Sequence, residues 1–164
     1  MEVKEIEDKN IWEKFISENS PQSLFQSWNW GEVVKRIQNL WRLGIFDNEK
    51  LVGIAQVNKV IAKKGNFLHI RHGPIFSSLN KKHLNFLLDY LKTLNTKEKT
   101  IFLRISPLIA NTPENKFLVK SKAPQVSQIL FVPLRKSVQY GHWRCPRRKF
   151  SVQSIAVNHA SKLW

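Results

Sequence analysis

Five leucines recur at helical spacing between residues 80 and 96, and a short apolar segment follows them. They are Leu84, Leu87, Leu88, Leu91 and Leu94. Spacings of three and four residues put these side chains on one face of an α-helix. Residues 101–105 then read as an apolar strand that Pro107 ends. Because a helix with one apolar face needs a sheet to cover it, we expect an α/β fold in which this helix is a crossover.

The patterns before this helix predict a strand, two helices and three further strands. In chain order these are a strand over residues 3–6, helices over 10–19 and 28–38, and strands over 41–46, 51–62 and 67–71. Asn10 is expected to cap the first helix, with Glu13 as its capping-box partner. The three later strands are joined by turn sequences and predict an antiparallel meander, with Gly53 marking a bulge.

The second helix is expected to bury one apolar stripe. Trp30, Val33, Val34 and Ile37 stand at i, i+3, i+4 and i+7, which is the spacing of an amphipathic helix.

The charge of the chain is unevenly distributed. Its 164 residues suit a single domain, and 27 lysines and arginines against 12 acidic residues give a formal charge of +15. The last 50 residues hold ten basic residues and no acidic one. No segment predicts a membrane span or a signal peptide, so we expect a cytoplasmic protein. A single cysteine, Cys145, makes a disulfide scaffold or a structural zinc site improbable.

The sequence contains no recognisable catalytic triad, metal motif or phosphate-binding loop, so no catalytic residue, metal ligand or cofactor is assigned. The order of elements resembles the acetyltransferase-type (GNAT) core, and the fold class expected is a mixed, largely antiparallel sheet flanked by helices. In that core a glycine-rich loop binds the pyrophosphate of coenzyme A. Here the corresponding residues 71–78 read RHGPIFSS, and Pro74 removes a backbone donor where the cofactor would need one.

Four segments together resemble the N-terminal part of the FemABX family of peptidoglycan bridge-forming aminoacyltransferases. They are residues 23–31 (SLFQSWNWG), the strand pair 41–46 and 51–55 (WRLGIF and LVGIA), residues 73–75 (GPI) and residues 101–107 (IFLRISP). The resemblance covers about residues 10 to 125.

The resemblance implies transfer of an amino acid from aminoacyl-tRNA to the stem peptide of a UDP-linked or lipid-linked muropeptide. It also implies a peripheral contact with the inner membrane surface. The ester of aminoacyl-tRNA is already activated, so the protein needs chiefly to align the acceptor amine and to stabilise the oxyanion.

Five residues are candidates for the acceptor's pyrophosphate or its groove. They are Lys35, Trp30, Arg71, His72 and Arg104. Lys35 stands where the resemblance places a basic residue that reaches the pyrophosphate, and its alternative reading is a solvated helix lysine. Trp30 could equally belong to the core, Arg71 and His72 to a surface loop, and Arg104 to a salt bridge. Ser106 replaces an acid that family members often have at this position.

The expected organisation is a GNAT-like domain over residues 1–118 and a divergent, irregular basic tail over residues 119–164. On this reading we expect the family's second domain to be absent. The acid-free tail suggests a truncated copy whose tail is read in a shifted frame or otherwise replaced, a hypothesis that translation of the downstream DNA would test. Whether such a copy is active is left open.

Two alternative functions are open. One is a small basic RNA-binding protein that uses a charged and stacking patch in the tail. That patch comprises Trp143, Arg144, Arg147, Arg148 and Lys149. The other is an acetyl-CoA-dependent N-acetyltransferase, which the Gly73-Pro74 junction disfavours.

Overall fold

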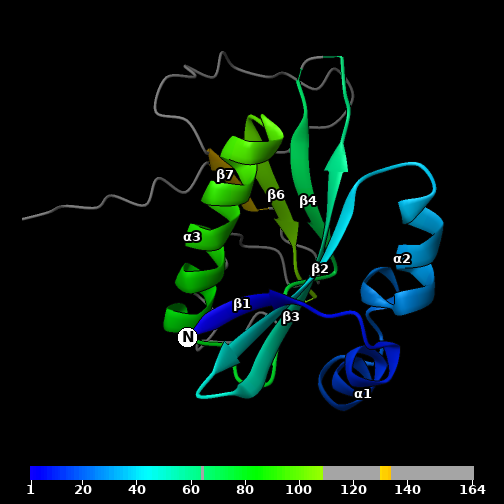
Figure 1. The fold of residues 1–164 in the computed structure, drawn as a ribbon, viewed down its shortest axis with the longest axis vertical. Helices are drawn as coiled ribbons and strands as arrows, with labels where there is room; N and C mark the ends of the chain where they lie inside the picture. The colour runs from blue at the N-terminus through cyan, green and yellow to red at the C-terminus, as the bar shows by residue number, and fades with distance from the viewer. Residues whose placement is uncertain (64, 109–129, 134–164) are drawn as a thin grey trace, which may run out of the picture.

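The computed structural model describes residues 1–63, 65–108 and 130–133. Their helices and strands are β1 (Glu2–Glu5), α1 (Lys9–Asn19), a 3-10 turn (Leu24–Gln26), α2 (Trp28–Lys35), β2 (Leu40–Asp47), β3 (Lys50–Val60), β4 (Phe67–Arg71), β5 (Ile75–Phe76), α3 (Lys81–Glu98), β6 (Phe102–Ser106) and β7 (Leu130–Pro133). Figure 1 shows one sheet with α3 against one face and with α1 and α2 on the opposite side.

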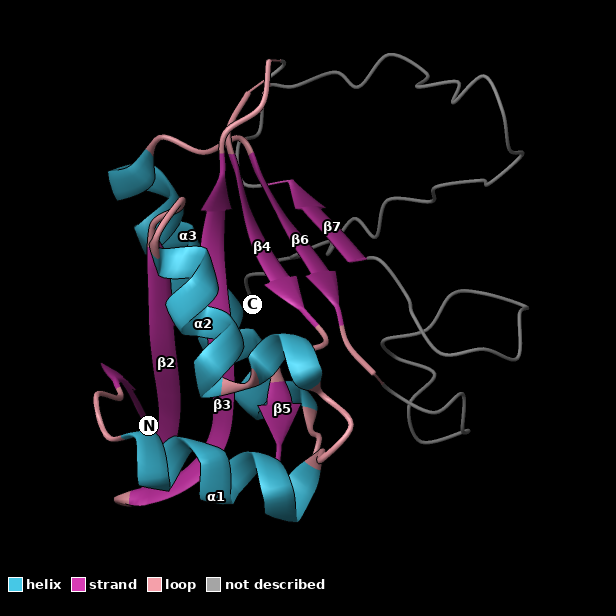
Figure 2. Cartoon of the chain, turned by 90° about the vertical axis from the view of Figure 1, so that its right-hand side faces the viewer, coloured by secondary structure: helices cyan, strands magenta, loops and turns pink. Residues whose placement is uncertain are grey.

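The sheet is mixed and largely antiparallel, as expected. Its strands follow the order β1-β2-β3-β4-β6-β7, and β5 pairs with β3 outside this path. Only β4 and β6 pair in parallel among the described strands. The chain between this parallel pair passes through α3, so α3 is the predicted crossover helix. Figure 2 shows β4, β6 and β7 side by side, next to the part of the sheet that α2 covers.

The leucine stripe forms the core between α3 and the sheet. All five leucines are buried, and they pack with Leu68, Ile70, Leu103 and Ile105 from the parallel strand pair. Asn80 caps α3, because its side-chain oxygen accepts a hydrogen bond from the His83 amide at 2.8 Å. This helix and its buried face are therefore confirmed.

The predicted cap of α1 is wrong. Asp8, not Asn10, is the N-cap, and its carboxylate accepts hydrogen bonds from the amides of Asn10 and Ile11 at 2.7 and 3.4 Å. Glu13 makes no capping box and instead accepts a hydrogen bond from the Trp28 amide at 2.6 Å. A tertiary contact between α1 and the start of α2 thus uses the carboxylate that the local pattern assigned to the cap.

The predicted buried stripe of α2 is also wrong. The helix ends at Lys35, earlier than expected, and Val33 and Ile37 are 54% and 77% exposed. Gly31 is the buried residue of α2, and the side chains beneath it are those of Gln56 on β3 and Arg42 on β2. A cation and its polar partners, rather than an apolar stripe, therefore define the inner face of this helix.

The meander of β2, β3 and β4 is confirmed. Its bulge lies beside Gly53, where the register shifts so that Ile45 faces Gly53 and Phe46 faces Leu51. The two-residue strand β5 was not expected.

Within the described ranges no helix is long and apolar enough to cross a membrane. The same residues contain no group of three or more histidine, cysteine or acidic side chains that could hold a metal ion. The predicted domain boundary at residue 118 and, apart from β7, the predicted tail lie outside the described residues.

Candidate functional site

Buried Gln26 holds the loop before α2 against the centre of the sheet. Its side-chain oxygen accepts a hydrogen bond from the Gln56 amide of β3 at 2.7 Å, and its side-chain nitrogen donates to the Arg71 carbonyl of β4 at 2.6 Å. Trp12 of α1 donates its indole N–H to the Gln26 carbonyl at 2.7 Å. The fully buried amide side chain therefore ties β3 to the end of β4, and the backbone carbonyl of the same residue holds α1.

The chain leaves β4 through a turn that packs directly on this amide. His72 has a left-handed backbone with φ of 52°, and the Gly73-Pro74 peptide is cis. A Cβ atom at Gly73 would lie 2.7 to 2.9 Å from the Gln26 side chain. Ser23 donates its hydroxyl to the His72 carbonyl at 3.1 Å. The family-like segments 23–31 and 73–75 thus meet in space, and the glycine is needed because there is no room for a side chain.

Arg42 fixes α2 on the sheet. Its guanidinium is 3% exposed and donates to the Trp28 carbonyl at 2.9 Å and to the Glu32 carboxylate at 2.8 Å. It also lies 3.6 Å from the centroid of the Trp28 ring. The Arg42 hydrogen bond lowers the pKa of Glu32. Trp28 is therefore a structural partner of Arg42 in this protein.

Phe25 joins three of the predicted site residues. Its ring meets the Trp30 ring edge-on at 4.8 Å and the His72 ring at 4.5 Å. The Arg71 guanidinium lies 4.6 Å from the centroid of Phe25. We call Phe25, Trp30, Arg71 and His72 the aromatic cluster. Arg71 is exposed whereas the three rings are half-buried, so the cluster presents a cation beside aromatic surface.

A second row of side chains continues from this cluster along the parallel strands. The register places Phe67 beside Phe102 and His69 beside Arg104, and the two phenylalanine rings stack with centroids 4.7 Å apart. Alternation along each strand directs these residues away from the leucine core under α3. Figure 2 shows that no described helix lies over β4 and β6 on this side. We call this side of β4 and β6 the open face.

The open face is positively charged at neutral pH through its arginines alone. Burial, followed by the charges of Arg104 and Arg71, lowers the pKa of His69 to about 4. Burial and the charge of Arg71 also lower the pKa of His72. Burial and Arg71 lower the pKa of Arg104, but an arginine stays protonated. His69 Nε2 and His72 Nδ1 are buried and have no hydrogen-bond partner among the described residues.

The structure therefore brings Trp30, Arg71 and His72 together. Arg104 lies near enough to Arg71 for the two guanidinium charges to interact. Lys35 lies apart, exposed in the last turn of α2, and makes no ring contact with the cluster in the described structure. Sequence reasoning did not select Phe25 or Gln26, although both stand in the segment 23–31. Both residues lie in a short turn before the N-cap of α2. Residues in such a turn follow no helix or strand periodicity, so the sequence pattern did not single them out.

The comparison with family models decides the relationship. The FemAB family model matches residues 8–130, a span that includes the aromatic cluster, the open face and α3. The chain belongs to the FemAB family. No curated protein matches the chain.

Solved structures agree with this membership at the level of the fold. FemX is similar with a TM-score of 0.60 and 24% identity, over 68% of this chain and 28% of FemX. This FemAB-family chain thus spans little more than a quarter of FemX.

Two further solved structures are aminoglycoside acetyltransferases. The aminoglycoside 6'-acetyltransferase type Ii has a TM-score of 0.44 and 14% identity, over 65% of this chain and 71% of that protein. The aminoglycoside 6'-N-acetyltransferase from Enterococcus faecium has a TM-score of 0.45 and 14% identity, over 68% of each chain.

Proposed function

We propose that this FemAB-family chain carries the acceptor site of an aminoacyltransferase in peptidoglycan bridge synthesis. The donor is aminoacyl-tRNA, and the acceptor is a UDP-linked or lipid-linked muropeptide on the cytoplasmic side of the membrane. The supporting observation is the aromatic cluster at the carboxyl end of β4, together with Arg104 in the middle of the neighbouring parallel strand β6. Ligands of α/β proteins commonly bind outside the carboxyl ends of such strands.

The chemistry of the cluster suits a pyrophosphate that carries sugar and peptide groups. The planar guanidinium groups of Arg71 and Arg104 match phosphate oxygens in pairs. Phe25 and Trp30 offer flat apolar surface beside those charges. Lys35 extends the positive charge along α2, and we propose it as a second, more distant phosphate contact.

Transfer itself asks little of the protein. The stem-peptide amine attacks the ester carbonyl of aminoacyl-tRNA, the C–N bond forms, and the ester C–O bond breaks. The tRNA ribose hydroxyl leaves with the proton that the amine gives up. A site that fixes the pyrophosphate therefore contributes by holding the amine in line with the ester.

Isothermal titration of the full chain with UDP-muramoyl-pentapeptide tests this proposal. Arg71→Gln removes one guanidinium from the open face and should weaken binding by about tenfold or more. Lys92→Gln is the matched control, because Lys92 is exposed on α3 across the sheet. No binding by the wild type, or equal binding by Arg71→Gln, would contradict the proposal. Tighter binding of acetyl-CoA or of RNA would favour one of the alternatives.

A further inference from the structure

One end of the domain gathers exposed cations and two exposed isoleucines. It comprises residues 35–39 after α2, residues 58–63 and 65–67 around the β3–β4 turn, and residues 95–101 at the end of α3; we call it the basic end. The Lys59 amide donates to the Asn39 carbonyl at 2.9 Å, and the Ile101 amide donates to the Asn66 carbonyl at 2.9 Å. These bonds hold the three segments together at one end of the sheet (Figure 1).

Of the six described cations of the basic end, only Lys59 makes a salt bridge to a described carboxylate. Lys35, Arg36, Lys63, Lys97 and Lys99 are all exposed there, and none makes a salt bridge to a described carboxylate. The one acid among these segments, Glu98, is paired with Lys59 at 3.1 Å. The basic end therefore carries an excess of positive charge over its one acid, and Glu32 of α2 lies near enough to Lys35 and Arg36 to interact with their charges.

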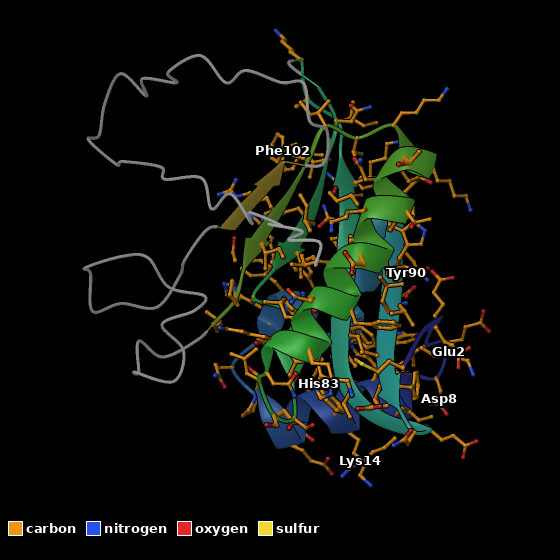
Figure 3. The ribbon with its side chains drawn as sticks, turned by 90° about the vertical axis from the view of Figure 1, so that its left-hand side faces the viewer. Glu2, Asp8, Lys14, His83, Tyr90 and Phe102 are labelled. Atoms are coloured by element: carbon orange, nitrogen blue, oxygen red, sulfur yellow. The ribbon has the colours of Figure 1, made fainter. Side chains whose placement is uncertain are left out.

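The opposite end of the domain is rich in acidic residues. Eight of the twelve acidic residues lie at this end: seven are on β1, α1, the short link between them and the β2–β3 turn, and Asp47 is the last residue of β2. Lysines at that end pair with them, as in Lys4–Glu2 at 2.7 Å and Lys82–Asp47 at 3.4 Å. Figure 3 shows Glu2 and Asp8 far from Phe102, which begins β6 beside the basic end. This polarity would orient the domain in the field of an anionic surface.

Two aliphatic side chains project from the basic end. Ile37 and Ile61 are each 77% exposed, more than any other large apolar residue in the described structure. The Lys59 amide and the Asn39 carbonyl join the two segments that carry them. Ile37 lies two residues before Asn39, and Ile61 lies two residues after Lys59. Exposed apolar side chains set among cations are the pattern by which proteins insert into the surface of an anionic bilayer.

We propose that the basic end docks on an anionic phospholipid bilayer, with Ile37 and Ile61 entering the headgroup region and the surrounding cations contacting lipid phosphates. An RNA partner would use the cations but not the isoleucines, since single-stranded RNA is held by aromatic stacking. The aromatic ring of this end, Phe67, is already stacked on Phe102. This docking surface is separate from the aromatic cluster. It shares only Lys35 with the proposed acceptor site, and none of the variants below changes Lys35, so the test does not depend on the proposed transferase activity.

Vesicle flotation of the full chain tests the proposal. Vesicles of phosphatidylcholine mixed with phosphatidylglycerol should bind the chain, and the double variant Ile37→Ser/Ile61→Ser should lower the partition coefficient about tenfold. Lys63→Gln and Lys97→Gln should each lower it about fivefold. The basic C-terminal residues are unchanged in every variant, so their attraction for the vesicles contributes equally to each measurement.

Matched controls come from the acidic end of the domain. Ile11→Ser removes an isoleucine that is 49% exposed on α1, and Lys14→Gln removes an exposed lysine there; both should leave partitioning unchanged. Thermal unfolding by circular dichroism should be the same for all these surface variants. Equal partitioning of Ile37→Ser/Ile61→Ser and wild type, or an equal loss in Ile11→Ser, would overturn the proposal. So would loss of RNA oligonucleotide binding in the basic-end variants without loss of vesicle binding.

Discussion

Replacement of Gln26 by methionine tests the link between the family-like segments most sharply. Methionine has nearly the same length as glutamine, so packing is largely kept while both hydrogen-bonding groups are lost. The Gln56 amide and the Arg71 carbonyl are then left without their partner in a place where the Gln26 side chain is fully buried. Each unpaired buried group costs about 1–3 kcal/mol, so the free energy of unfolding should fall by about 2–5 kcal/mol.

Urea denaturation followed by tryptophan fluorescence measures this loss. Gln22→Met is the control, because Gln22 is exposed in the same loop and its replacement should change stability by less than about 0.5 kcal/mol. The m-value should be the same in both variants, since the surface exposed on unfolding does not change. A Gln26→Met variant as stable as the control would refute the role given to this amide.

Three further changes test other parts of the structure. Gly31→Ala would place a methyl group against the Gln56 side-chain oxygen and the Arg42 guanidinium and should cost about 1–3 kcal/mol of unfolding free energy, whereas Asn29→Ala on the exposed side of α2 should not destabilise the protein. Because the pKa of His69 is about 4 in the folded protein, the unfolded chain binds this proton first as the pH falls, and stability declines between pH 6.5 and 4. His69→Gln should abolish about 2–3 kcal/mol of the wild-type loss between pH 7 and 4.5 in denaturation experiments; identical pH profiles would show that His69 is not held neutral. Asn80→Ala removes the cap of α3 and should cost about 1 kcal/mol, measured by thermal unfolding; an unchanged transition would contradict the cap.

The spacing of apolar residues was sufficient to predict a helix or strand where one face of that element packs on an apolar layer. The leucine stripe predicted α3 and its buried side because the spacing of the residues directly encodes the face. The short strand 102–106 after it then required a crossover. Turn residues in the same way predicted the meander of β2, β3 and β4.

Local pattern failed where polar tertiary contacts decide the packing. On α2, buried Arg42 and Gly31 displace the expected stripe, because the guanidinium needs the Trp28 carbonyl and the Glu32 carboxylate. At α1, a nearby aspartate caps the helix, and the expected capping glutamate serves another helix. Neither contact leaves a periodic trace in the sequence.

The candidate site was predicted only in part for the same reason. Trp30 stands in a segment that resembles the family, and Arg71 and His72 stand at a strand end where a ligand could dock; the structure gathers all three. Phe25, on which they converge, precedes α2 in a loop and has no local signal of its own. Lys35 was selected with them, yet it lies toward the other end of α2.

Chemical-shift mapping on the uniformly ¹⁵N-labelled 19.2 kDa chain tests the central claim most directly. When UDP-muramoyl-pentapeptide is added, the largest amide shifts should fall at Phe25, Trp30, Arg71, His72 and Arg104. Residues of α3 on the other side of the sheet should shift little. Shifts concentrated on α3, or none at concentrations where calorimetry detects binding, would contradict an acceptor site on the open face.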